Sequence, residues 1–266
     1  MRLGQLLAGI DVQFEPASGI DVLDLTLDSR KVTDGTLFVA VKGSSKHGMD
    51  YADAAILSGA SAIIYDEWDG EIPEVIPALH VPGLRHKVGR IAHSFFGNPC
   101  MQMDIVGVTG TNGKTTTIHL IAQIAESLGC KASCIGTLGV SIGTEKLIES
   151  DRTTPDAITL ASIFAELRDH GVNFVAMEVS SHALDQGRVD GIPFCVGLIT
   201  NLTRDHLDYH GTMEAYGAAK KRLFQDFDLK SKSPDRMDRH GPQIAHPTAA
   251  LLHPVALPLT AQPNHG

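Results

Sequence analysis

A glycine-rich turn between a short apolar strand and a helix constrains the fold of this chain more than any other segment. It lies within Val106–Thr117, which reads VGVTGTNGKTTT. In such a turn successive backbone N–H groups point at an anion, and the following helix directs the positive end of its dipole there. Measured against G-x-x-x-x-G-K-[ST], the first glycine position holds Val108. The segment is therefore a variant phosphate-binding loop, for which we expect a nucleoside triphosphate as ligand.

Two side chains of the turn carry the chemistry that this pattern predicts. Lys114 supplies a mobile positive charge for the outer phosphates, and the hydroxyl of Thr115 is a ligand for magnesium. The alternative is an ordinary strand-to-helix turn rich in Gly and Thr. We disfavour it because a Gly-Lys-Thr-Thr run followed by helical apolar spacing, with Gly129 as the expected C-terminal cap, rarely arises by accident.

Composition limits the class of protein. With 266 residues, 43% of them hydrophobic, the chain can bury one large core or two modest ones, and we expect two domains. A formal charge of −9 argues against a general nucleic-acid-binding surface. The four cysteines lack C-x-x-C spacing, and no apolar run is long enough for a signal peptide or a membrane span. We expect a soluble cytoplasmic protein with reduced cysteines, without nucleic-acid or membrane partners.

Residues 20–97 have the pattern of a small α/β unit that precedes the phosphate-binding loop. Apolar strands are predicted at 36–41 and 61–65, with a short helix at 52–57 between them. A later helix at 84–96 meets Gly97-Asn98-Pro99, which should end it. We therefore place a domain boundary after residue 97, so that the first domain is 1–97.

From residue 104 onward the pattern alternates strand, loop and helix, which predicts a mostly parallel sheet with helices on both faces. A helix should begin near residue 154, with Thr154 as its N-cap and Pro155 at its first position. Glu178 follows a strand at the edge where ligands of open α/β sheets gather, and His206 follows another. The predicted strands are 105–109, 131–136, 172–177 and 195–200, and a last short helix is predicted at 213–224.

The character of the chain changes after Phe227. Six of the 13 prolines lie beyond residue 225, and no Phe, Tyr or Trp follows Phe227. Such a segment is not typical of a folded core. We expect a second domain at 98–226, incomplete in this chain, and a divergent, poorly ordered tail at 227–266.

Six motifs follow one another along the chain. They are Leu27–Arg30 (LDSR), Leu37–Gly43 (LFVAVKG), Gly107–Thr117 (GVTGTNGKTTT), Thr153–Pro155 (TTP), Met177–His182 (MEVSSH) and Thr200–Gly211 (TNLTRDHLDYHG). This ordered series resembles the Mur ligases, most closely the branch that adds the third residue of the peptidoglycan stem peptide. The resemblance covers roughly residues 20 to 224 and is more specific than the phosphate-binding loop alone. Members usually continue well beyond this length, so we expect a truncated chain.

The resemblance implies an α/β fold with a small N-terminal UDP-binding domain and a partial P-loop ATPase domain. It also implies an ATP-dependent amide ligation in peptidoglycan precursor synthesis. ATP would phosphorylate the terminal carboxylate of UDP-N-acetylmuramoyl-L-alanyl-D-glutamate, and the amine of an incoming amino acid, meso-diaminopimelate by default, would displace phosphate. ATP and Mg²⁺ are the implied cofactors, the UDP-muramoyl dipeptide and the amino acid are the implied partners, and we expect a monomer.

Site residues follow from the resemblance position by position. Thr115 and Glu178 would hold magnesium, His206 would bind a second magnesium, and Lys220 matches a lysine that family members carry in carbamylated form. With Lys114, these make up the implied catalytic and metal-binding set. The implied nucleotide-binding residues are Gly110, Thr111, Asn112, Gly113, Lys114, Thr115 and Thr116, and the implied substrate-binding residues are Leu27, Ser29, Thr153, Thr154, Ser180, Gln186 and Arg188.

Two positions depart from the family pattern, and several alternatives stay open. Ser44–Lys46 does not match the His-Gln-Ala of some members, and Arg152 stands where some members have Asn. Without the resemblance, His206 is equally a surface histidine, and Lys220 belongs to an ordinary charged helix face. The other functions to weigh are a non-catalytic module that binds nucleotide or UDP-muramoyl peptide, a generic P-loop ATPase or switch, and folylpolyglutamate synthetase.

Overall fold

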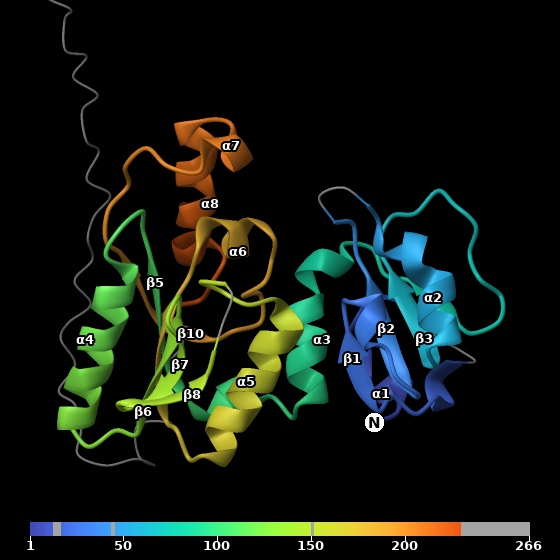
Figure 1. Ribbon diagram of the computed structural model, residues 1–266, viewed down its shortest axis with the longest axis horizontal. Coiled ribbons are helices and arrows are strands. Elements are labelled where there is room, and N and C mark those ends of the chain that lie inside the picture. Colours follow the sequence, from blue (N-terminus) through green and yellow to red (C-terminus); the bar gives the residue numbers. More distant parts are fainter. Residues whose placement is uncertain (13–16, 44–45, 150–151, 230–266) are drawn as a thin grey trace, which may run out of the picture. The chain divides into compact units, whose positions relative to one another are not determined.

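The computed structural model describes residues 1–12, 17–43, 46–149 and 152–229 (Figure 1). Its strands form a four-stranded and a six-stranded sheet, one from each half of the described chain. Most of the tail expected at 227–266 lies outside the described residues, as do Ser44 and Ser45 of the segment that departs from the family pattern. Within 227–229, Phe227 packs its ring against Phe194, with 5.2 Å between the ring centroids.

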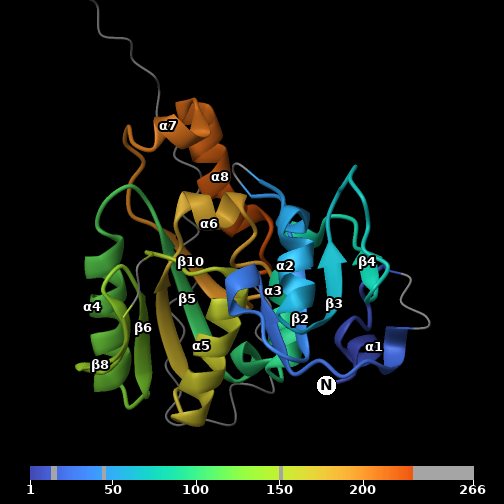
Figure 2. The ribbon, with the colours of Figure 1, turned by 45° about the vertical axis from the view of Figure 1, so that its right-hand side comes forward.

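The first sheet is parallel throughout, with strand order β1-β2-β3-β4. Its centre is β2, where every residue is buried. Because side chains alternate along a strand, Leu37 and Val39 join the core under α3, and Phe38 and Ala40 join the core under α2. Figure 2 shows α2 beside β2 and β3. The elements are α1 (Leu3–Leu6), β1 (Asp24–Thr26), β2 (Thr36–Ala40), α2 (Ala52–Leu57), β3 (Ala60–Tyr65), β4 (Ala78–His80) and α3 (Val88–Phe95).

The second sheet has the order β10-β5-β9-β6-β7-β8. Its four strands β10, β5, β9 and β6 are parallel, and β7 and β8 form an antiparallel hairpin at one edge. The predicted mostly parallel sheet is confirmed. The hairpin was not predicted. The strands are β5 (Asp104–Thr109), β6 (Ala132–Gly136), β7 (Gly139–Ile142), β8 (Glu145–Ile148), β9 (Phe174–Glu178) and β10 (Phe194–Ile199).

Helices cover both faces of this sheet, as predicted. Along β5, Ile105 packs into the core on the α5 side, and Val106 and Val108 pack under α4. Figure 1 shows α4 and α5 on opposite sides of the strands. Because β5, β6 and β9 are parallel, their carboxyl ends lie at one common edge of the sheet. The phosphate-binding loop and Glu178 lie at this edge. The helices are α4 (Lys114–Ser127), α5 (Ala157–Asp169), α6 (Ser181–Asp185), α7 (Leu207–His210) and α8 (Met213–Gln225).

The predicted start of α5 was wrong. Its N-cap is Asp156, whose carboxylate accepts hydrogen bonds from the backbone N–H groups of Ile158 and Thr159 at 3.1 Å each. Thr154 cannot cap the helix because its hydroxyl is engaged elsewhere. It donates to the carbonyl of Glu178 at 3.0 Å and accepts from the N–H of Ser180 at 3.2 Å. Thr154 thus holds the backbone of Glu178 and Ser180 after β9 and is not free to cap α5.

The helix predicted at 84–96 is interrupted. A 3-10 turn, η4 (Leu84–His86), precedes α3, and Lys87 separates the two. Gly83 begins the turn in the left-handed region, with φ of 63°, which redirects the chain after β4. The other 3-10 turns are η1 (Ala17–Gly19), η2 (Ser29–Lys31), η3 (Gly48–Tyr51) and η5 (Pro99–Gln102). Across the described ranges, the helices are all too short or too polar to traverse a bilayer.

Candidate functional site

The phosphate-binding loop connects β5 to α4. Gly110 and Gly113 have φ of 141° and 84°, values that residues with a Cβ rarely adopt. A Cβ on Gly110 would also lie 1.9 Å from the hydroxyl of Thr200. The Lys114 ammonium folds back over the loop and donates to the carbonyls of Gly110 and Thr111 at 2.9 and 3.0 Å. The Lys114 amine, which is expected to neutralise the outer phosphates, therefore lies directly against the phosphate-binding loop.

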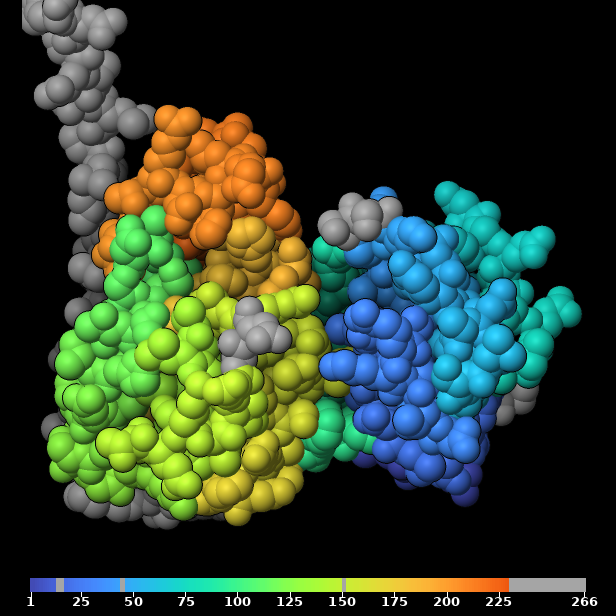
Figure 3. Space-filling model, viewed as in Figure 1, coloured from blue at the N-terminus to red at the C-terminus, as the bar shows by residue number. Residues whose placement is uncertain are grey.

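The segment that follows β10 fixes the shape of this loop. The N–H of Thr111 donates to the Asn201 carbonyl, and the N–H of Asn112 donates to the Asn201 side-chain oxygen, both at 3.0 Å. The Thr200 hydroxyl donates to the Asn112 carbonyl at 2.6 Å. Figure 3 shows residues from this segment and α8 (orange) against the loop region (green). Two of the loop's N–H groups are thus used to hold its conformation.

Glu178, the last residue of β9, is 1% exposed. Its Oε1 accepts hydrogen bonds from the Thr115 hydroxyl at 2.8 Å and from the Thr137 N–H at 2.9 Å. Gly136 makes room for this carboxylate, because a Cβ there would lie 2.3 Å from Oε1. A buried carboxylate paired with a threonine hydroxyl is an all-oxygen donor set, which suits a hard cation such as Mg²⁺. The structure therefore brings together the two residues expected to hold magnesium.

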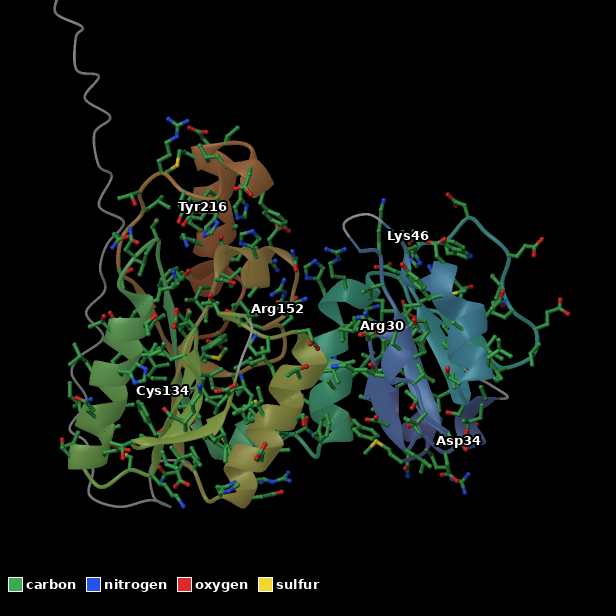
Figure 4. All side chains as sticks on the ribbon, viewed as in Figure 1. Arg30, Asp34, Lys46, Cys134, Arg152 and Tyr216 are labelled. Atoms are coloured by element: carbon green, nitrogen blue, oxygen red, sulfur yellow. The ribbon has the colours of Figure 1, made fainter. Side chains whose placement is uncertain are left out.

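Lys220 on α8 is 2% exposed, so the alternative of an ordinary charged helix face does not hold for it. Its ammonium donates to the Gly110 carbonyl at 2.9 Å and lies 4.4 Å from the ring centroid of Tyr216. Burial lowers the pKa of Lys220 to about 8, and the nearby Lys114 charge adds to the effect. Figure 4 places Tyr216 on α8, and its hydroxyl lies 3.1 Å from that of Thr111. Lys220 and Tyr216 therefore contact the cradle from the α8 side.

His206 precedes α7 and takes a left-handed conformation, with φ of 50°. Its ring lies 5.0 Å from that of His182 and 6.1 Å from that of Tyr216, measured between centroids. Burial lowers the pKa of His182, and protonated His206 and His210 nearby would lower it further. Within the described ranges, no group of three or more His, Cys, Asp or Glu side chains is arranged to hold a metal ion. His206 and Lys220 thus each contact the ring of Tyr216, whereas Thr115 and Glu178 contact each other.

A pocket of about 450 Å³ lies beside this edge. Of the expected substrate residues, Leu27, Gln186 and Arg188 line it, and Ser29 lies outside its lining, in η2. Burial lowers the pKa of the Arg188 guanidinium, and the neighbouring Arg152 lowers it further. Figure 4 labels Arg152 on the stretch before α5. The cationic side chains of the lining are Lys42, Arg85, Arg152 and Arg188, against a single carboxylate, that of Asp156.

Hydrogen bonds connect this pocket to Glu178. The Arg188 guanidinium donates to the side-chain oxygen of Gln186 and to the carbonyl of Thr154, both at 2.9 Å. Thr154 in turn holds the backbone of Glu178 and Ser180, as described for α5. The Ser180 hydroxyl caps α6 by accepting from the N–H of Ala183. Five of the expected substrate residues, Thr153, Thr154, Ser180, Gln186 and Arg188, thus lie in or beside one network.

Sequence reasoning missed several side chains of this region. Thr137 contacts Glu178, Tyr216 contacts the loop, and Lys42 and Arg85 line the pocket. Thr137 was discoverable, since it directly follows β6 and the ends of parallel strands share one edge. Tyr216 gave no signal, because a lone tyrosine in a helix is more often a core residue.

Two family models match the chain. The Mur ligase middle domain matches residues 108–233, and the Mur ligase family catalytic domain matches residues 22–94. The first sheet lies within one match, and the loop between β5 and α4 and the second sheet, apart from most of β5, lie within the other.

Curated relatives and a solved structure agree with these matches. A UDP-N-acetylmuramoyl-L-alanyl-D-glutamate–2,6-diaminopimelate ligase of Xanthomonas campestris pv. campestris (strain 8004) is 43% identical over 263 residues, 98% of this chain and 52% of the relative. The enzyme of the same name from Xylella fastidiosa (strain 9a5c) is 44% identical over 260 residues, 97% and 51% of the two chains. A solved structure of a ligase of that name gives a TM-score of 0.69 at 34% identity, covering 85% of this chain and 45% of that one. The chain spans about half the length of the curated relatives it matches.

Proposed function

Because this chain belongs to the Mur ligase family, we propose that it carries the nucleotide site and the carboxylate-substrate site of an ATP-dependent amide ligase. The substrate is UDP-N-acetylmuramoyl-L-alanyl-D-glutamate, and the incoming amino acid is meso-diaminopimelate, following the names of the relatives. Residues 1–97 bind the UDP-muramoyl part and residues 98–226 bind ATP. The observation that carries the proposal is the Thr115–Glu178 contact at the mouth of the phosphate-binding loop, next to a strongly cationic pocket.

The reaction follows from the chemistry of a carboxylate, which is a poor electrophile. An oxygen of the substrate carboxylate attacks the γ-phosphorus of ATP, ADP leaves, and an acyl phosphate results. The amine of the amino acid then attacks the acyl carbon, the C–N bond forms, the nitrogen gives up one proton to solvent, and inorganic phosphate leaves with the C–O bonding electrons. The protein positions the reactants and neutralises charge, which is most of what phosphoryl transfer requires.

The chain's own residues divide this work. Gly110–Thr116 cradle the phosphates, and Lys114 turns from its loop carbonyls toward the outer phosphates. Thr115 and Glu178 would hold Mg²⁺, with His206 and a carbamylated Lys220 for a second ion. When bound, magnesium would act as a Lewis acid and neutralise phosphate charge. The lowered pKa of Lys220, about 8, leaves a useful fraction of free amine for carbamylation by carbon dioxide.

The pocket is suited to an anionic ligand. Lys42, Arg85, Arg152 and Arg188 give it four cationic groups, and the carboxylate of Asp156 is already occupied by the N-terminus of α5. Guanidinium groups bind carboxylates and phosphates through paired N–H donors. The UDP-muramoyl dipeptide carries both kinds of anion, so Leu27, Ser29, Thr153, Thr154, Ser180, Gln186 and Arg188 are assigned to it.

Two variants of the purified chain test the proposal by separating the two ligands. Lys114→Met should weaken binding of ATP with Mg²⁺ about tenfold or more and leave the UDP-muramoyl dipeptide unaffected. Arg188→Gln should do the reverse. Titration calorimetry measures both affinities, and phosphate release dependent on diaminopimelate measures turnover. Binding of both ligands without turnover would identify a non-catalytic module. Failure of the unaltered chain to bind either ligand would refute the assignment.

A further inference from the structure

Thr137 lies between the two halves of the proposed site. It follows β6 at the edge where Glu178 ends β9, and its N–H donates to Glu178 Oε1 at 2.9 Å. Its hydroxyl lies 3.3 Å from Glu178 Oε2 and 3.1 Å from the hydroxyl of Thr153. Glu178 belongs to the proposed cation site, and Thr153 adjoins Arg152 of the cationic pocket. One side chain thus contacts Glu178 of the proposed cation site and Thr153, the neighbour of a pocket residue.

A hydroxyl has one proton, so Thr137 can donate to only one of these oxygens at a time. When it donates to Glu178, its own oxygen is free to accept the Thr153 proton, and Thr153 then offers only lone pairs to the pocket. When it donates to Thr153, the Thr153 proton is free for another acceptor. The two arrangements therefore present opposite hydrogen-bonding groups to a ligand.

We propose that Thr137 is a positioning residue whose single proton couples the cation site at Glu178 to Thr153, the proposed substrate residue beside the cationic pocket. A cation held by the Glu178 carboxylate repels the Thr137 proton, which turns to Thr153. Thr153 then donates its own proton to an oxygen of the substrate. This coupling rests on the proposed function, and because coupling free energies are reciprocal, the substrate strengthens binding of nucleotide and cation by the same factor.

Binding measurements on the whole 266-residue chain test the coupling. The affinity for UDP-muramoyl dipeptide is measured by calorimetry with and without Mg²⁺ and a non-hydrolysable ATP analogue. We expect the analogue and Mg²⁺ to tighten dipeptide binding about fivefold, the scale of one hydrogen bond to a ligand oxygen. Thr137→Ser keeps the hydroxyl and should keep this factor. Thr137→Val keeps the N–H contact and the shape, and should reduce the factor to about one.

The outcomes separate the coupling from the function on which it rests. The coupling would be overturned if Mg²⁺ and the analogue tightened dipeptide binding equally in the unaltered chain and in Thr137→Val. It would also be overturned if the unaltered chain bound both ligands and neither changed the affinity for the other. Absence of binding of either ligand to the unaltered chain would overturn the proposed function and the coupling together. Thr137 is exposed, so the valine should be tolerated, and Thr137→Ala replaces it if that variant does not fold.

Discussion

At the scale of single residues, Lys220 is an amine that the fold keeps away from water. It is 2% exposed, and its partners are a carbonyl of the phosphate-binding loop and the face of Tyr216. A buried ammonium of this kind costs folding free energy unless it loses its proton or acquires a counter-charge. Lys221, its neighbour in the chain, is exposed and has no such constraint.

The pH dependence of stability should report this burial. The pKa of Lys220 is about 8 in the folded chain against 10.5 for an unperturbed lysine. Between these values the unfolded state binds the extra proton, so the free energy of unfolding rises with pH from 8 to 10.5. Lys220→Met should lack this rise, and Lys221→Met should keep it. Urea denaturation at pH 7 to 10 in bicarbonate-free buffer makes the comparison, and identical pH profiles for the two variants would contradict the burial.

A second prediction at the residue scale concerns Gly136. A Cβ there would lie 2.3 Å from the Glu178 carboxylate, so Gly136→Ala must displace that group. We expect a loss of about 1 to 3 kcal/mol in the free energy of unfolding, from overpacking, and weaker Mg²⁺-dependent nucleotide binding. Gly19→Ala is the matched control, because nothing lies within 4 Å of the added carbon. Chemical denaturation and calorimetry measure the two effects, and a stable Gly136→Ala that binds nucleotide normally would contradict this packing.

At the scale of elements, apolar runs and glycine punctuation predicted β2, β3 and the four parallel strands of the second sheet, but not the edge strands β1 and β4, which have three residues each. They failed where a polar side chain had two available partners. Thr154 and Asp156 are both good N-cap residues, and the sequence could not show that Glu178 and Ser180 would occupy Thr154. The β7–β8 hairpin was missed because its strands are only four residues each.

The cap of α5 can be tested directly. Asp156→Ala removes the acceptor for two backbone N–H groups and should lower the free energy of unfolding by about 1 kcal/mol. Asp156→Ser retains an N-cap oxygen and should restore most of it. Urea denaturation of the two variants against the unaltered chain measures the difference. An alanine variant as stable as the serine variant would mean that Asp156 does not cap the helix.

Single residues of the candidate site were easier to predict from the sequence than the contacts between them. The loop, Glu178 and the pocket residues Leu27, Gln186 and Arg188 were named from motifs, whereas Lys42 and Arg85 of the same pocket were not. The burial of Lys220 and the contact of Tyr216 with Thr111 arise from packing between segments distant in the chain. No local pattern carries that information, so these contacts became visible only with the fold.

At the scale of the whole molecule, α3 packs on α5, and one core includes Ile91 and Ala92 of α3 with Ile158 and Ala161 of α5. His93 of α3 is buried in this region. Its ring lies 3.4 Å from the Cys100 sulfur and 6.0 Å, between centroids, from the ring of Phe164. Burial lowers the pKa of His93 to about 4. Protonation of this one residue therefore opposes a contact between the two halves of the described chain.

Acid should lower the free energy of unfolding through protonation of His93. Below pH 6.5 the unfolded state binds the extra proton, so the free energy of unfolding falls as the pH falls from 6.5 through about 4. His93→Gln should flatten that part of the profile, at some cost in stability at pH 7. His119→Gln serves as the control, because His119 is only partly buried. Thermal melts from pH 7 to 4 give the profiles, and equal acid sensitivity of all three chains would contradict the role of His93.

The hydrogen bonds that hold the phosphate-binding loop also have a consequence for biosynthesis. Thr111 bonds to Thr203, 92 positions later, and to Tyr216, 105 positions later. A chain emerging from the ribosome releases its N-terminal segments first, and each domain folds as its residues become available. The first sheet can form early, whereas the loop must wait for the segment after β10 and for α8. The phosphate-binding loop is therefore among the last parts of the described chain to reach its folded conformation.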